Sequence, residues 1–144
     1  MIPLSHIQVN CCAKDWKQAI EITAQPLVHY HEIEKEYINC MIENVYAFGP
    51  YLIIAPHFAL IHGSPGLYIH ENALSIATFQ NEIYLHQAKE PVRIMMCVAC
   101  SSQMSYIRTL GAIASVLMEE NMIEKILACQ SRREVYNLFD DENK

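Results

Sequence analysis

The chain has 144 residues, of which 52% are apolar and 18% charged, and its formal net charge is −6. A chain of this length and composition can bury a hydrophobic core, which excludes a disordered, solvating protein. A nucleic-acid partner is not expected, because no run of Lys and Arg is longer than Arg132-Arg133.

The first third of the chain predicts a short strand followed by two helices. Residues 7–9 could form a short first strand. Asp15 suits the N-cap of a following helix, which Pro26 should bend or stop. Apolar residues spaced by three and four predict a second helix from Ile33 to about Ala47. The pair Gly49-Pro50 should break that helix.

Strands are expected in the middle of the chain. Short apolar runs, bounded by Pro, Gly and polar turns, are typical of buried strands. These runs are residues 51–55, 58–61, 73–79, 83–85 and 92–100.

Helical spacing returns after the last of these runs. It extends from Gln103 to Leu127, and Ser131 begins a capping box for a final helix through Leu138. The order of strand, helices, strands and helices predicts an α/β fold with three α/β/α layers, in which helices flank a small mixed sheet. No linker or repeat divides the chain, so we expect a single domain over residues 1–144.

The cysteines favour neither a zinc site nor a disulfide framework. Cys97 and Cys100 form one C-x-x-C pair without a second ligand pair at usable spacing, and they lie three apart in a predicted strand, so they should point to opposite faces. No secretory segment opens the chain, and the apolar run Ile94 to Cys100 is far shorter than the roughly 20 residues that span a bilayer. We therefore expect a cytoplasmic protein without membrane insertion, metal or cofactor.

Two of the seven histidines stand out from the others. His57 and His62 bracket the predicted strand 58–61, and His62 opens the small-residue loop 63–66. A strand end fixes an imidazole, and the loop leaves room for a partner and can turn backbone N–H groups toward an anion. Imidazole is a good nucleophile near pH 7, because its ordinary pKa is about 6.5. On these features alone, a structural histidine at position 62 remains the alternative.

Several segments also carry a family resemblance in their order and spacing. Residues 14–20 are similar to an opening helix, residues 37–42 and 48–56 to a second helix and a central strand, and Phe58-Ala59-Leu60-Ile61-His62-Gly63 to a phosphorylation-site motif. Together they resemble the enzyme IIA domain of the bacterial sugar phosphotransferase system, in its mannitol/fructose class. The ascorbate-type and cryptic mannitol-type members look most similar.

The resemblance implies a phosphotransferase with a phosphohistidine intermediate. His62 would accept a phosphoryl group from the carrier protein HPr and pass it to a Cys or His of a IIB partner during sugar uptake. Such a transfer needs an in-line nucleophile and donors for the phosphoryl oxygens. The sugar, the phosphorylated ring nitrogen and the oligomeric state, a homodimer included, stay open.

The chain departs from the family pattern at four positions. The family usually carries Gly at the position of His57, Pro at Ile61, and Arg or another helper at Ser64. Its second active-site His falls on Tyr106, or on Met104 if the alignment shifts by two. A neutral phenol donates one hydrogen bond and does not become a cation at pH 7.

Two functions are compatible with these departures. The first is a working phosphocarrier in which His57, Ser64 or Tyr106 compensates for the missing groups. Five residues of extended strand span about 16 Å, which weakens the case for His57 unless Pro56 turns the chain. The second is an enzyme IIA-like regulatory or binding module whose His62 transfers phosphate weakly or not at all.

A partner surface can also be predicted around His62. Five apolar residues near it in sequence could form a ring that meets a partner, with the alternative that the first two belong to the core. They are Phe58, Ile61, Pro65, Leu67 and Tyr68.

Overall fold

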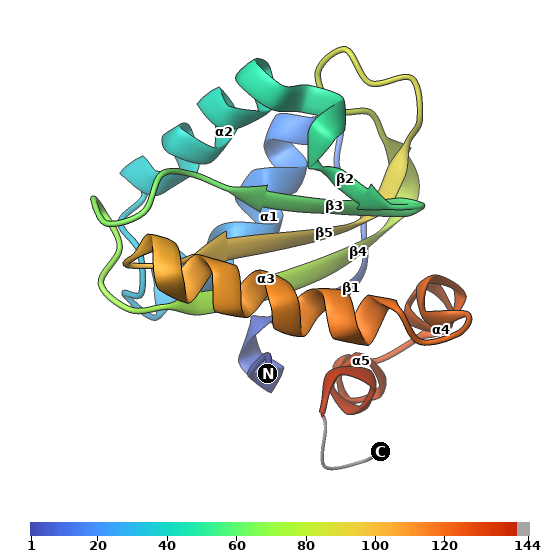
Figure 1. Ribbon diagram of the computed structural model, residues 1–144. Helices are drawn as coiled ribbons and strands as arrows, with labels where there is room; N and C mark the ends of the chain where they lie inside the picture. Colours follow the sequence, from blue (N-terminus) through green and yellow to red (C-terminus); the bar gives the residue numbers. More distant parts are fainter. Residues whose placement is uncertain (141–144) are drawn as a thin grey trace.

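A five-stranded mixed sheet forms the centre of the computed structural model, which describes residues 1–140 (Figure 1). The strand order is β1-β4-β5-β3-β2, with β1 parallel to β4, β3 parallel to β5, and the pairs β4–β5 and β2–β3 antiparallel. The strands are β1 (Ile7–Cys11), β2 (Ile53–Ala55), β3 (His57–His62), β4 (Ala73–Ile83) and β5 (Val92–Ala99).

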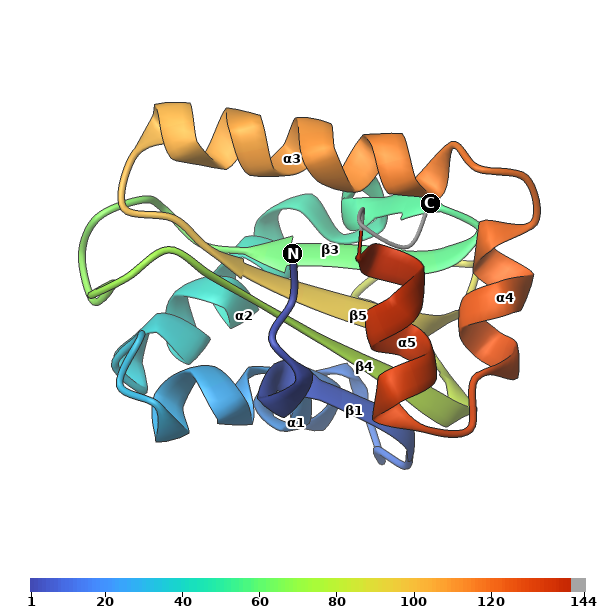
Figure 2. The same cartoon turned by 90° about the horizontal axis from the view of Figure 1, so that it is seen from below.

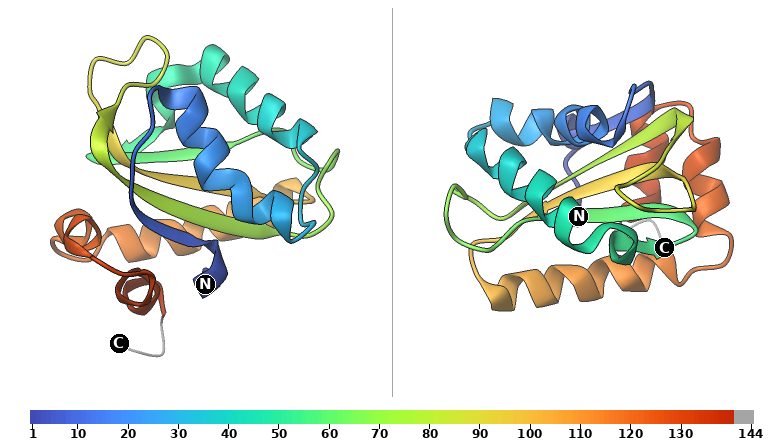
Figure 3. Two further views of the ribbon diagram at one scale, coloured as in Figure 1. Left: turned by 180° about the vertical axis from the view of Figure 1, so that it is seen from behind. Right: turned by 90° about the horizontal axis from the view of Figure 1, so that it is seen from above.

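Helices cover both faces of this sheet, which confirms the predicted three-layer α/β/α architecture (Figures 2 and 3). On one face lie α1 (Trp16–His29) and α2 (Glu36–Phe48). On the other lie α3 (Gln103–Leu117), α4 (Met122–Ala128) and α5 (Arg132–Phe139). Two short 3-10 helices, η1 (Leu4–His6) and η2 (Gly49–Leu52), precede β1 and β2.

The two faces bury separate apolar clusters, and β3 contributes to both. Ala59 and Ile61 pack toward α1 and α2, while Phe58 and Leu60 pack toward the other three helices. Successive side chains of a strand point to opposite faces, so a strand covered on both sides needs a continuous apolar sequence. This strand ends at His62, which is partly buried.

Two predicted helix starts are confirmed by their caps. The carboxylate of Asp15 accepts a hydrogen bond from the backbone N–H of Gln18 (2.8 Å), and the hydroxyl of Ser131 accepts one from the N–H of Glu134 (3.2 Å). Each cap gives a hydrogen-bond acceptor to one of the backbone N–H groups in the first turn, which have no acceptor within the helix.

The sequence-based boundaries differ from the structure in three other places. Of the two effects expected at Pro26, a stop is excluded, because α1 continues to His29 with Pro26 buried inside it. The predicted strand 51–55 shortens to β2, since Gly49–Leu52 form η2 with Pro50 in its first turn. The predicted strands 73–79 and 83–85 are not separate: β4 runs from Ala73 to Ile83 through the exposed polar residues 80–82, and residues 84–85 lie outside it.

The second helix also starts later than expected. Ile33 lies outside α2 and forms an isolated bridge with Ile69, which ties the α1–α2 connection to the loop after His62. Its apolar side chain is buried like those of the helix, so its spacing alone could not separate a bridge from a helical turn.

Candidate functional site

His62 lies at the carboxyl end of β3 beside a cavity of about 130 Å³. Three segments far apart in sequence surround this cavity: α2, the loop after β3, and the first turn of α3. Their residues that line it are Asn44, His62, Gly63, Ser64, Pro65, Gln103 and Tyr106.

The imidazole of His62 is held at one nitrogen. Its Nδ1 lies 3.4 Å from the carbonyl oxygen of Gly63 and 3.5 Å from Nδ2 of Asn44, which also donates a 2.8 Å hydrogen bond to the carbonyl of His62. The ring of Tyr106 packs on the imidazole, with 4.8 Å between ring centroids. In the tautomer whose Nδ1–H donates to the Gly63 carbonyl, the lone pair is on Nε2, which has no hydrogen-bond partner among residues 1–140 and is free to react.

Burial sets the protonation of both rings. Desolvation lowers the pKa of His62 below its ordinary value of 6.5, and the contact with the Gly63 carbonyl only partly opposes this. The imidazole is therefore mostly neutral at pH 7 and keeps a lone pair for attack. Desolvation raises the pKa of Tyr106, so its phenol stays protonated and can donate a hydrogen bond.

The structure brings two of the three predicted helper residues to His62. Ser64 and Tyr106 line the cavity, and Met104, the alternative for the second histidine position, is 59% exposed and outside its lining. Of the two candidates, Tyr106 is thus the one placed against the imidazole.

His57 is not brought to the site. It pairs with Val92 at one end of the β3–β5 ladder, whereas His62 pairs with Val98 at the other. Pro56 does turn the chain, but between β2 and β3, which leaves His57 exposed beside a different cavity near α4. A contact between His57 and His62 is therefore excluded in this fold.

Two residues of the cavity, Asn44 and Gln103, were not predicted from the sequence. Asn44 follows Tyr37 by seven residues, or two helical turns, so it lies on the same face of α2 as the buried Tyr37. A polar residue on that apolar face was the available signal. Gln103 carried no such signal, because only the tertiary packing of α3 beside β3 brings this residue to the cavity.

The predicted apolar ring around His62 is partly wrong. Phe58 and Ile61 are fully buried, since β3 is covered on both faces, and they belong to the core. Pro65 and Leu67 are exposed, Leu67 at 71%, and Tyr68 is half-buried. The exposed part of the predicted ring therefore lies on the loop rather than on the strand.

Three of the six cysteines, Cys97, Cys100 and Cys129, are buried as expected for core residues, whereas Cys12 is exposed and Cys11 and Cys40 are partly buried. Cys97 packs in the cluster with α1 and α2 and Cys100 in the cluster on the opposite face, and all six thiols are free. Among residues 1–140, no group of three or more His, Cys, Asp and Glu side chains could hold a metal ion. In the same residues, none of the helices has both the length and the apolar composition to cross a bilayer.

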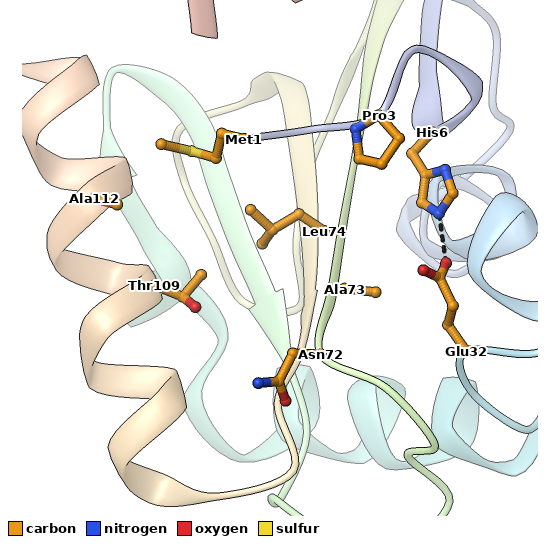
Figure 4. Close-up of a pocket in the computed structure, with 9 residues that line it drawn as sticks. All are labelled: Met1, Pro3, His6, Glu32, Asn72, Ala73, Leu74, Thr109 and Ala112. Atoms are coloured by element: carbon orange, nitrogen blue, oxygen red, sulfur yellow. Dashed lines mark hydrogen bonds and ion pairs between the residues drawn. The ribbon is translucent and has the colours of Figure 1, made fainter. Parts of the chain in front are cut away.

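A second histidine is engaged in a separate cavity of about 310 Å³ (Figure 4). His6 is almost fully buried, its Nε2 is hydrogen-bonded to Oε1 of Glu32, and its Nδ1 lies 2.8 Å from Oγ of Ser5. Both ring nitrogens are thus occupied by neighbours. The pair fastens the N-terminal segment to the α1–α2 connection and takes no part in the cavity at His62.

Comparisons with known proteins agree with this architecture. The chain is 26% identical to the mannitol-specific cryptic phosphotransferase enzyme IIA component of Escherichia coli K12 (95% of this chain, 93% of the relative). It is 25% identical to the ascorbate-specific EIIA component of Mycoplasma pneumoniae (95% and 87%). The mannitol enzyme IIA of E. coli, solved in complex with phosphorylated enzyme IIB, shares the fold with a TM-score of 0.84 at 17% identity, and 96% of each chain is covered.

A family model covers almost the whole chain. The model described as "Phosphoenolpyruvate-dependent sugar phosphotransferase system, EIIA 2" matches residues 1–142. The chain therefore belongs to this EIIA family of the sugar phosphotransferase system.

Proposed function

We propose that this protein is a phosphocarrier that accepts a phosphoryl group from phospho-HPr on Nε2 of His62 and passes it to a IIB partner during sugar uptake. The observation that carries the proposal is the neutral His62, held through Nδ1, with Nε2 free beside an open cavity. In the transfer, the N–P bond of the donor phosphohistidine breaks as a bond from Nε2 to phosphorus forms.

Several hydrogen-bond donors at the cavity could stabilise the negatively charged oxygens of an arriving phosphoryl group. Asn44 offers its amide and Tyr106 its phenol. The first turn of α3 borders the cavity through Gln103, and the N–H groups of Gln103 and Met104 have no acceptor among residues 1–140. A helix start with free N–H groups and a positive dipole end stabilises anions.

Phosphoenolpyruvate, enzyme I and HPr provide the direct test. We expect acid-labile phosphate on the protein, mapped to His62, that appears only when HPr is present. A folded protein that takes no phosphate from phospho-HPr would refute the phosphocarrier and leave the regulatory or binding module.

Tyr106 should make the transfer slow relative to a site with two histidines. Loss of a cationic donor beside the developing phosphoryl charge costs on the order of 3 kcal/mol, or about a hundredfold in rate. The variant Tyr106→His is therefore expected to raise the initial rate of transfer from phospho-HPr, up to about a hundredfold. Ser115→His, exposed farther along α3, is the matched control and should leave the rate unchanged. Equal rates for all three proteins would contradict the role given to position 106.

The loop after His62 should contribute to the docking surface for IIB. Leu67 is 71% exposed, so Leu67→Asp is expected to raise the Kd for a IIB domain about tenfold or more without lowering the unfolding midpoint. Met118→Asp serves as the control, because Met118 is 85% exposed at the far end of α3. The surface is wrong if Leu67→Asp binds IIB as the wild type does in a calorimetric titration.

The same proposal includes the cellular setting. We place the protein in the cytoplasm as one EIIA domain, supported by six free thiols, which suit a reducing compartment, and by the family match over residues 1–142.

A further inference from the structure

The hydroxyl of Tyr37 joins the ends of two strands at the site. Tyr37 belongs to α2 and is 1% exposed. Its oxygen accepts a 2.8 Å hydrogen bond from the backbone N–H of Gly63 and donates a 3.0 Å hydrogen bond to the carbonyl of Val98. Burial raises the pKa of Tyr37 well above its usual range, so the hydroxyl keeps its proton and fills both roles.

This bridge stands where the β3–β5 ladder ends. His62 and Val98 are the last pair in the register of the two parallel strands. In a continuing parallel ladder, the N–H of the residue after His62 would bond directly to the carbonyl of Val98. The phenol is inserted at that position, so the chain leaves β5 immediately after His62 without losing its hydrogen bonds.

The backbone at Gly63 has little freedom to move toward α2. A Cβ atom at this position would lie 3.0 Å from both Cβ of Cys40 and Cε1 of Tyr37. Asn44, on the same face of α2, donates to the carbonyl of His62. The peptide group between His62 and Gly63 is therefore held at both ends by side chains of one helix.

We propose that Tyr37 is a positioning residue for phosphoryl transfer, which fixes the backbone on either side of His62 so that Nε2 is presented to the donor. The proposal rests on the proposed phosphocarrier function. Tyr37 touches no reacting atom, and its effect passes through Gly63 and Val98.

The variant Tyr37→Phe removes only the hydroxyl oxygen. The rate constant for transfer from phospho-HPr is expected to fall about tenfold to a hundredfold, because small displacements of a reacting group are costly. The KM for phospho-HPr should stay unchanged, since the exposed surface is intact. Nitrogen NMR of the His62 ring should show a pKa closer to 6.5 than in the wild type, as the imidazole leaves its half-buried position.

Two control variants separate positioning from other effects. Tyr51→Phe removes a hydroxyl from a tyrosine that is 86% exposed, and should change neither the rate nor the His62 titration. Ile126→Val lowers stability from the opposite face of the sheet, and should leave the His62 ring signals as they are.

Each outcome decides the proposal. A wild-type rate constant and wild-type ring signals in Tyr37→Phe would overturn it. If the wild-type protein takes no phosphate, the proposed function fails, and the ring titration alone judges whether Tyr37 positions His62. If Tyr37→Phe does not fold, amide exchange in the wild type decides: protection of the Gly63 N–H supports the bridge, and exchange as fast as in an exposed loop overturns it.

Discussion

Replacement of His62 by Gln should lower phosphoryl acceptance from phospho-HPr to background, a loss on the order of 10⁵-fold or more. An amide has no lone pair that can form a stable bond to phosphorus, and His62 is the only histidine among the residues that line the cavity. The expected measurement is acid-labile phosphate after incubation with phosphoenolpyruvate, enzyme I and HPr. Gln is similar in size to His, so the packing against Tyr106 should be largely retained.

The matched control lies on the same strand. His57 is exposed at the other end of β3, with a φ of +65°, and Asn tolerates this left-handed conformation better than most residues. His57→Asn should therefore be phosphorylated like the wild type. Phosphate on folded His62→Gln, or its loss in His57→Asn, would contradict the assignment of the nucleophile.

The second large effect concerns stability and is expected at Gly49. Gly49 ends α2 with a φ of +37°, and a Cβ atom there would lie 2.5 Å from the backbone oxygen of His86. Backbone oxygens cannot move aside as a flexible side chain can, and the left-handed conformation adds strain. Gly49→Ala should lower the free energy of unfolding by about 2–4 kcal/mol, measured from the denaturant midpoint at constant slope.

Another glycine gives the opposite expectation and serves as its control. Gly111 lies within α3, and a Cβ atom there would have nothing within 4 Å. Gly111→Ala should raise the free energy of unfolding by about 0.5–1 kcal/mol, because alanine loses less backbone entropy in a helix. Equal effects of the two substitutions would show that the contact with His86 does not limit Gly49.

Local sequence patterns predicted most of the fold because they depend on interactions between residues that are close in the chain. The caps at Asp15 and Ser131 need only a side chain and the N–H three residues on, and the apolar run 58–61 needs only strand alternation. The errors arose where tertiary contacts overrode these preferences. Pro26 remains helical because it is buried, and Ile33 is buried in a bridge instead of a helical turn.

The candidate site was predictable only in part for the same reason. His62 could be found because a strand end and a small-residue loop adjoin it in sequence. The Tyr37–Val98 hydrogen bond joins residues 61 apart, and no local pattern reports such a contact. The positions of Phe58 and Ile61 depended on whether β3 is covered on one face or both, which only the packing of the helices settles.

The strand order also has a consequence for biosynthesis. The central strand β5 lies between β3 and β4, which both precede it in the chain. Until residues 92–99 leave the ribosome, β3 can pair only with the three-residue β2, and apolar side chains such as Phe58 and Ile76 lack their covering layer. Unpaired apolar strands are prone to associate with other chains. Prematurely terminated chains that end before residue 92 should therefore aggregate, and the nascent protein depends on β5 to complete the sheet that carries His62.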